Sequence, residues 1–299
     1  MNAALSAAVE RMASDAIGGR FGLSSIEPVA GGDINTALRA RGAAADAFVK
    51  LRPGADLAMF EAEARDLAAL AACEAFRVPR VLGCEAVGDD AVLVLEWLDL
   101  RPLRGDAEGE RAGHALAALH RLPTETHFGW PYPNFIGTTP QPNNRHDNWP
   151  RFFTLERLAP QLARAAANGY HGALQRDGER LCERAAALFL DYQPAPSLLH
   201  GDLWSGNIGM LEDGTPALFD PAAYIGDREA DLAMTELFGG FPMSFYVAYR
   251  QSWPLHEGYE VRKGLYNLYH VLNHLNLFGR GYLAQAERMA SRLATELAR

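Results

Sequence analysis

The segment LLHGDLWSGN places a carboxylate, Asp202, five residues before an amide, Asn207, and a second carboxylate, Asp220, follows in FDP. Magnesium prefers hard oxygen ligands, whereas a general base must face the hydroxyl that it deprotonates rather than the metal. A loop that carries an acid and an amide at this spacing, followed by a second acid, separates these two tasks. Asp202 is therefore predicted to be a catalytic base, and Asn207 and Asp220 are predicted to bind Mg²⁺, in a phosphoryl-transfer site.

Taken alone, either HGD or FDP is as typical of a turn with polar caps as it is of a catalytic motif. Short β-like runs at 208–211 and 217–220, joined by a turn at 212–215, predict a hairpin between the two motifs. The order and spacing of both motifs around this hairpin favour the catalytic interpretation over two unrelated turns.

Upstream, the chain has the other parts of an ATP site in the expected order. They are a glycine-bearing loop with Gly31, Gly32, Asp33 and Asn35, then Lys50 in AFVKL, and then Glu61 or Glu63. Glycines let backbone N–H groups approach phosphates, a lysine can bridge them, and a glutamate can hold that lysine extended. The two glutamates flank the apolar stripe of their predicted helix about equally, so periodicity alone leaves both open.

The elements that carry these upstream residues are an antiparallel sheet and a helix. Five β-like runs are separated by Gly and Asp residues; they lie at 26–30, 37–39, 47–51, 81–86 and 91–96. Apolar residues also recur at helical spacing over 56–73, and these are Leu57, Phe60, Ala64, Leu67 and Ala71. A further helix is predicted at the N-terminus, before the sheet.

After Pro102 helical periodicity dominates, which predicts an α+β chain of two lobes, 1–97 and 98–299. Backbone groups near Glu96 and Leu98, at the boundary, are predicted to pair with the edge of adenine. The segment 124–148 is rich in Pro, Asn, Gly and aromatic residues, which is typical of a long ordered loop or a ligand-facing excursion rather than a linker.

Composition excludes several classes of protein. A net charge of -9 and a pI near 5.5 argue against a nonspecific nucleic-acid binder, which needs clustered Lys and Arg. The three cysteines have no CxxC spacing, so neither a disulfide framework nor a zinc site is expected. No segment reads as a signal peptide or a membrane span, and we expect a cytoplasmic protein, by default a monomer.

At this point the chain resembles the fructosamine kinase (ketosamine 3-kinase) family, whose protein-kinase-like fold is related to that of aminoglycoside phosphotransferases. The matching segments are GGDIN, FVK, MFEAEA, VLEWL, NFIG with PQPN, HGDLWSGN and FDPAAYIGDREADLAMTELFGGF. The resemblance implies ATP- and Mg²⁺-dependent phosphorylation of the sugar 3-hydroxyl of a ketosamine, free or on a protein. The phosphorylated adduct is then expected to break down and release the amine.

The resemblance also implies roles for single residues. The register of MFEAEA selects Glu63 as the partner of Lys50, and Asp231 is implied to brace the catalytic loop. His200 is expected to pack within that loop rather than act as acid or base. Four further residues are the predicted sugar contacts, and these are Asn134, Gln141, Asn143 and Trp204.

Two rival functions fit part of the same pattern. Another kinase of the same fold, acting on an aminoglycoside, choline or a free sugar, would use identical phosphate machinery. A catalytically inactive nucleotide-binding scaffold would be expected to have lost Lys50, Asp202 or Asp220, yet all three are present. His270 and His274, four apart on a predicted helix, are interpreted as packing residues rather than metal ligands.

Overall fold

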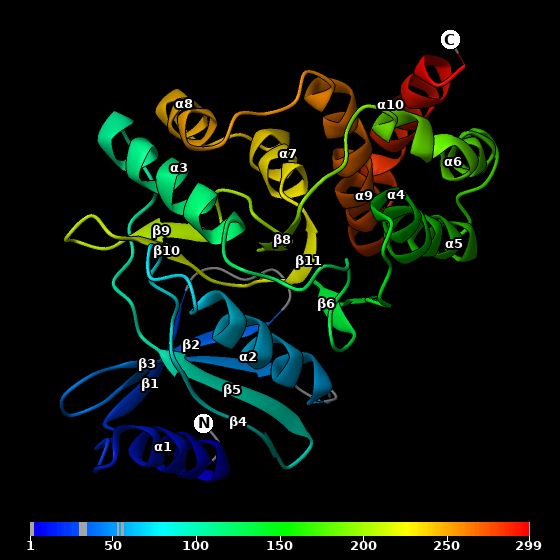
Figure 1. The fold of residues 1–299 in the computed structure, drawn as a ribbon. Helices are drawn as coiled ribbons and strands as arrows, with labels where there is room; N and C mark the ends of the chain where they lie inside the picture. The colour runs from blue at the N-terminus through cyan, green and yellow to red at the C-terminus, as the bar shows by residue number, and fades with distance from the viewer. Residues whose placement is uncertain (1–2, 30–34, 53, 55–56, 299) are drawn as a thin grey trace.

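A five-stranded antiparallel sheet forms the N-terminal lobe of the computed structural model, which describes residues 3–29, 35–52, 54 and 57–298 (Figure 1). The strand order is β1-β2-β3-β5-β4. The strands are β1 (Ser25–Pro28), β2 (Thr36–Arg41), β3 (Ala47–Arg52), β4 (Val81–Val87) and β5 (Asp90–Glu96). Gly88, with φ of 62°, takes the left-handed conformation that the tight β4–β5 turn needs. The predicted hairpin is thus confirmed.

Two helices cover opposite faces of this sheet, α1 (Ala3–Ile17) and α2 (Ala58–Leu70). Side chains alternate along β5, which lies between β3 and β4, so that Val92 and Val94 pack in the cluster of α1, whereas Leu93 and Leu95 pack in that of α2. In Figure 1, α2 lies on the face turned toward the second lobe.

The buried stripe of α2 differs from the predicted one. Phe60, Leu67 and Leu70 are buried, and so are Ala62 and Asp66, whereas Ala71 lies beyond the helix end and is exposed. The helix therefore buries two faces, one against its own sheet and a second one that carries a carboxylate.

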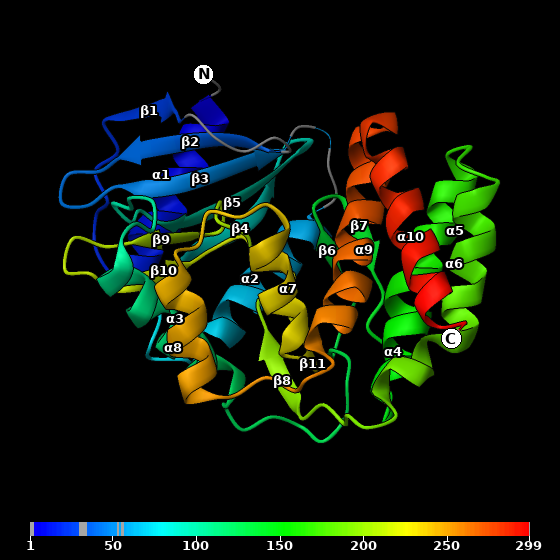
Figure 2. The ribbon, with the colours of Figure 1, turned by 90° about the horizontal axis from the view of Figure 1, so that it is seen from above.

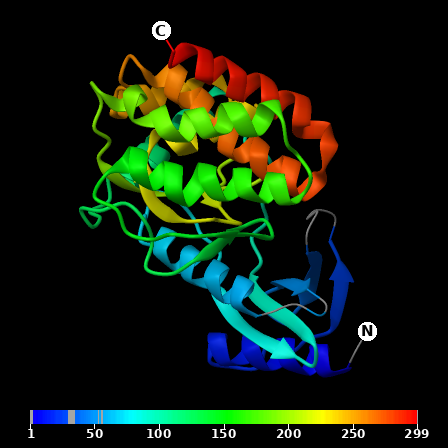
Figure 3. The ribbon, with the colours of Figure 1, turned by 90° about the vertical axis from the view of Figure 1, so that its right-hand side faces the viewer.

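The second lobe is mainly helical, and Figure 3 shows it stacked on the sheet lobe. Its helices are α3 (Asp106–His120), α4 (Trp149–Phe153), the π-helix η1 (Thr154–Leu158), α5 (Ala159–Ala167), α6 (Ala173–Arg184), the 3-10 helix η2 (Ala185–Phe189), α7 (Glu229–Leu237), α8 (Met243–Ser252), α9 (Tyr259–Phe278), the 3-10 helix η3 (Arg280–Tyr282) and α10 (Leu283–Glu296). Helix α9 packs against α5, α7 and α10, as Figure 2 shows from above. This arrangement confirms the predicted α+β class.

Three short two-stranded sheets lie within this lobe. They are β6 (Asn134–Ile136) with β7 (Thr139–Gln141), β8 (Pro196–Leu199) with β11 (Tyr224–Asp227), and β9 (Ile208–Met210) with β10 (Pro216–Leu218). The predicted loop 124–148 is ordered but contains the β6–β7 hairpin. Because β8 pairs with β11, with Leu199 opposite Tyr224, the loops that follow β8 and β10 meet at one place.

One apolar cluster runs through both lobes. It joins Phe60 and Leu67 of α2 to Leu116 of α3, and it includes Leu203 of the loop after β8 and Ile208 of β9. The predicted boundary at residues 97 and 98 lies between the end of β5 and the start of α3. Among the described residues, no helix is long and apolar enough to cross a membrane.

Candidate active site

The loop between β8 and β9 carries Asp202 and Asn207 and closes on itself. The side-chain nitrogen of Asn207 donates to the backbone oxygen of Asp202 at 2.8 Å and to its carboxylate at 3.3 Å. The same nitrogen lies 3.4 Å from the backbone oxygen of Asp220. The amide nitrogen is thus turned to the loop, which leaves the amide oxygen as the atom suited to a cation.

Asp202 lies in an environment that suits a base. Burial raises its pKa to about 7, the charges of Asp220 and Asp231 add to the rise, and the Asn207 hydrogen bond opposes it. A carboxylate with a pKa near neutrality is about half ionised near pH 7, and it is a stronger base than an ordinary carboxylate.

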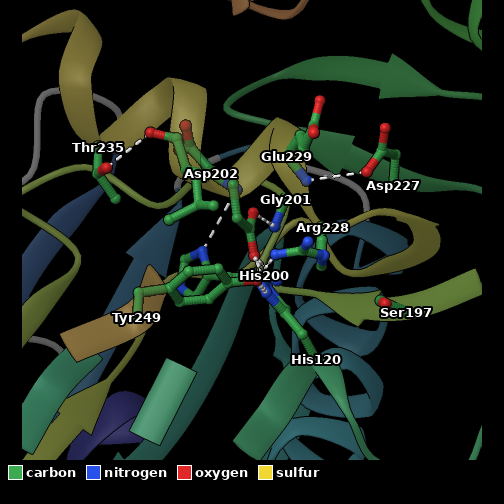
Figure 4. Close-up of polar contacts among 12 residues, drawn as sticks. His120, Ser197, His200, Gly201, Asp202, Asp227, Arg228, Glu229, Thr235 and Tyr249 are labelled. Carbon is green, nitrogen blue, oxygen red and sulfur yellow. Dashed lines mark hydrogen bonds and ion pairs between the residues drawn. The ribbon is translucent and has the colours of Figure 1, made fainter. Parts of the chain in front are cut away.

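A buried carboxylate from α7 holds the start of this loop, at the place where Figure 4 shows His120, His200 and Gly201. Asp231 accepts the backbone N–H groups of His200 at 2.7 Å and Gly201 at 2.9 Å, and it contacts His120 Nε2 at 3.2 Å. Burial by itself would raise the pKa of Asp231, but the hydrogen bond and charge of His120 lower it below its ordinary value. The predicted brace is confirmed. It fixes the backbone immediately before Asp202, the predicted base.

Gly201 is required at the centre of the braced segment. Its φ is 81°, and a Cβ there would lie 2.0 Å from the backbone oxygen of Ala222. His200 completes the segment, because its Nδ1 accepts the N–H of Asp202 at 3.3 Å and its Nε2 donates to Phe219 at 2.9 Å. These two contacts fix a neutral tautomer, and burial lowers the pKa of the ring, so His200 packs the loop as predicted.

Asp220 has a backbone conformation unusual for its residue type. Its φ is 56°, and it is the one non-glycine residue in the described part of the chain with a positive φ. Such a conformation is costly and clusters at functional sites. It directs the half-exposed carboxylate to Lys50, whose Nζ lies 2.6 Å from Asp220 Oδ1.

The same ammonium group pairs with α2. Lys50 Nζ lies 2.5 Å from Glu63 Oε1, whereas Glu61 pairs with Arg65 on the helix surface. Burial alone would lower the pKa of Lys50, but the charges of Asp220 and Glu63 raise it above its ordinary value, so the lysine is charged. Glu63 is thus the glutamate in contact with Lys50.

The remaining predicted ATP contacts differ in what the structure gives. Gly31, Gly32 and Asp33 lie outside the described residues, whereas Asn35 precedes β2 and its buried Oδ1 has no hydrogen-bond partner among the described residues. The carboxylate of Glu96 pairs with Arg77. The backbone N–H of Glu96 donates to the backbone oxygen of Arg80 at 2.8 Å.

The backbone carbonyl of Glu96 is therefore the group of this residue that is predicted to contact adenine. Leu98, two residues on, is partly exposed. The contacts of both residues with adenine stay predictions.

The predicted sugar contacts fall into two groups. Asn134, Gln141 and Asn143 are at most 5% exposed. The side-chain NH₂ groups of Gln141 and Asn143 each donate to Asn134 Oδ1 at 2.8 Å. They form a buried amide network, and their contact with a sugar stays a prediction. Trp204 is 39% exposed and meets Phe238 edge-on, with ring centroids 6.5 Å apart. It is the predicted sugar contact whose side chain is open to solvent.

Sequence reasoning missed three residues around this site. His120 supports Asp231, Phe238 extends the aromatic surface of Trp204, and Asp66 ties α2 to the second lobe. A charged residue three positions after Glu63, on the same side of the helix, was the one available signal for Asp66. The two histidines of α9 lie against aromatic rings, as expected for packing residues: His270 meets Tyr269, and His274 meets the rings of Phe238 and Tyr282.

Comparison with known proteins identifies relatives over nearly the whole chain. The family model described as fructosamine kinase matches residues 5–296. A Synechocystis protein named as a probable ketoamine kinase is 44% identical over 282 residues, 94% of each chain. A solved Haemophilus somnus structure named as a fructosamine-3-kinase has a TM-score of 0.87 and 27% identity, and the match covers 95% of this chain and 96% of that one.

More distant proteins share the fold of this chain. An aminoglycoside phosphotransferase solved with AMP-PNP and hygromycin B has a TM-score of 0.63 at 15% identity, and the match covers 96% of this chain and 98% of that one. At that identity the likeness concerns the fold. The match of the family model and the 44% identity together show that this chain is a member of the fructosamine kinase family.

Proposed function

We propose that this protein transfers the γ-phosphoryl group of ATP to the sugar 3-hydroxyl of a ketosamine. The observation that carries the proposal is the meeting of Asp202, Asn207 and Asp220 with the Lys50–Glu63 pair at one site. The names of the relatives, ketoamine kinase and fructosamine-3-kinase, supply the acceptor class. A scaffold without activity would not need to keep this set of groups together.

In the proposed step, Asp202 accepts the proton of the sugar hydroxyl as its oxygen attacks the γ-phosphorus. A new O–P bond forms, the bond between phosphorus and the β,γ-bridging oxygen breaks, and ADP leaves with the electron pair. Lys50 provides positive charge for the phosphate oxygens, and Glu63 holds it extended. Phosphorylation at this position is then expected to promote breakdown of the adduct and release of the amine.

The residues at the site fit a magnesium ion. Asn207 and Asp220 would hold it through an amide oxygen and a carboxylate, and the ion would neutralise phosphate charge. In the described part of the chain, no group of three or more His, Cys, Asp or Glu side chains could hold a metal alone. Two protein ligands completed by phosphate oxygens are typical of Mg²⁺ in kinases.

We also propose that the protein is a cytoplasmic monomer and that it acts on free or protein-bound ketosamines. Cys73, Cys84 and Cys182 are free thiols, as a reducing compartment requires. Size-exclusion chromatography with light scattering tests the monomer, and a dimer mass would refute it.

A substrate screen tests the reaction itself. ATP consumption with mass detection of product is measured for fructose-lysine, ribulose-lysine, kanamycin and choline. We expect a single added phosphate on a ketosamine, and Asp202→Asn serves as the control for background hydrolysis. Phosphorylation of kanamycin or choline without either ketosamine would overturn the assignment.

A further inference from the structure

Asp66 is a buried carboxylate that accepts hydrogen bonds from two other segments of the chain. Its Oδ1 accepts the indole N–H of Trp130 at 2.9 Å, and its Oδ2 accepts the side-chain amide of Asn134 at 2.7 Å. Oδ2 also accepts the backbone N–H of Ala223 at 3.0 Å. The residue is 1% exposed, and these donors are all neutral.

A carboxylate in this environment is costly for folding. Burial raises its pKa to about 7, against the hydrogen bonds from Asn134, Ala223 and Trp130 that favour the ionised form. The burial of this ionisable group costs free energy, which its hydrogen bonds offset only in part. These hydrogen bonds connect α2 to the second lobe.

Asp66 connects the two elements that carry the partners of Lys50. On α2 it follows Glu63 by three residues, so both lie on the same side of one rigid helix. Its partner Ala223 follows Asp220 by three residues, in the segment that leads into β11. Lys50 is held between Glu63 and Asp220, so Asp66 joins the two elements that position it.

The donor side of the contact is itself fixed to the second lobe. Asn134 also donates to the backbone oxygen of Ala223 at 2.8 Å and accepts from Gln141, whose oxygen accepts the hydroxyl of Tyr269 at 2.6 Å. Tyr269 belongs to α9, the helix at the centre of that lobe. The donors of Asp66 are thus anchored, and α2 is the element that they hold.

We infer that Asp66 is a positioning residue, which fastens α2 to the segment after Asp220 and so holds Glu63 against Lys50. This inference rests on the roles proposed above for Lys50, Glu63 and Asp220. Without the carboxylate, α2 is free to shift relative to the second lobe, and the ammonium of Lys50 loses its fixed place.

A double-mutant cycle tests whether Asp66 acts through Glu63. The full chain is assayed with ATP, Mg²⁺ and fructose-lysine, and kcat and KM for ATP are measured for Asp66→Asn, Glu63→Gln and the double variant. Asp66→Asn keeps the volume but presents an NH₂ group to the donors. We expect about a 10- to 100-fold loss of kcat/KM, the usual cost of misplacing a phosphate contact. In the Glu63→Gln background we expect the same change to cost less than about 3-fold.

The matched control is Asp177→Asn, which removes a carboxylate that is 9% exposed on α6. Its effect should be small and equal in both backgrounds. Should Asp66→Asn fail to fold, Trp130→Phe carries the cycle, because it removes one donor and keeps the carboxylate; about a 3-fold loss that disappears in the Glu63→Gln background is expected.

Two results would overturn the inference: activity of Asp66→Asn within about 2-fold of wild type, or an equal loss in both backgrounds. If Glu63→Gln alone has no effect, the proposed role of Glu63 fails as well. A loss for Glu63→Gln without one for Asp66→Asn instead refutes only the role of Asp66. The two failures are therefore distinguishable.

Discussion

The ammonium group of Lys50 lies 2.6 Å from the carboxylate of Asp220, although 170 positions separate them in the sequence. This contact joins β3 of the sheet lobe to the segment that follows β10 in the helical lobe. Glu63 shares the same ammonium at 2.5 Å, so loss of any one of these three charges alters the surroundings of the other two. The catalytic apparatus therefore responds to substitution as one coupled unit.

Asp202→Asn tests the base. We expect turnover to fall by about 10²- to 10⁴-fold, because the amide cannot accept the hydroxyl proton, while ATP affinity is largely kept. Steady-state kinetics give the turnover and calorimetry gives the ATP affinity. Asp191→Asn, an exposed change at a turn, is the control. Turnover near that of wild type would remove Asp202 from the role of base.

Glu63→Gln, compared with Glu61→Gln, tests the partner of Lys50. Loss of the Glu63 charge should lower kcat/KM for ATP by about 10- to 100-fold, since Lys50 is no longer held extended. Glu61 pairs with Arg65 at the surface, where an ion pair contributes little, so its variant should stay within about 2-fold of wild type. Equal effects of the two substitutions would contradict the assignment.

Asp220→Asn tests the metal site. Asparagine tolerates the positive φ at this position, so the backbone is preserved while the charge is lost. We expect the Mg²⁺ concentration for half-maximal activity to rise by about 10-fold or more, because a carboxylate is the stronger ligand. A magnesium titration at fixed ATP gives this value. Unchanged activity at limiting Mg²⁺ would exclude Asp220 as a ligand.

Trp204→Leu tests the acceptor side. The exposed indole is predicted to contact the sugar, and an aromatic contact of this kind contributes about 0.5 to 1.5 kcal/mol. The KM for fructose-lysine should therefore rise by about 3- to 10-fold, while the KM for ATP serves as the internal control and stays constant. An equal rise in both KM values would indicate a general disturbance of the loop.

The pH dependence of stability tests the environment of Asp66. Its pKa of about 7 in the folded protein lies above the ordinary value, so the folded state binds this proton more tightly than the unfolded chain. The contribution of Asp66 to stability is thus fully present below about pH 4 and is lost as the pH rises through about 7. Asp66→Asn removes this dependence.

Urea denaturation of both proteins at several pH values gives the difference in free energy of unfolding. We expect wild type minus Asp66→Asn to decrease between about pH 4 and pH 8 by on the order of 2 to 4 kcal/mol. A constant difference would mean that the pKa of Asp66 is not raised.

Much of the architecture follows from local patterns. Two short β-like runs around a turn with Gly and Asp predicted the β4–β5 hairpin, and apolar residues at helical spacing predicted α2. Both signals depend on residues that are close together in the sequence. The set Asp202, Asn207 and Asp220 was found for the same reason, since one short loop and one hairpin carry it.

Other features depend on contacts that no local pattern records. The polar composition around Asn134, Gln141 and Asn143 predicted a ligand-facing loop, yet these amides satisfy one another in the interior. The partners of Asp66 lie 64 to 157 positions away, so its burial could not be inferred from the helix alone. Polar residues paired over such distances look the same in sequence as residues that face solvent.

The apolar cluster that joins α2 to α3 also bears on how the chain folds. Because the cluster spans both lobes, neither lobe can bury its own share of this surface alone. The two lobes are thus expected to melt in a single cooperative transition. The proposed catalytic groups come together only when segments far apart in the chain have docked, so a nascent N-terminal half holds Lys50 and Glu63 but not Asp202, the proposed base.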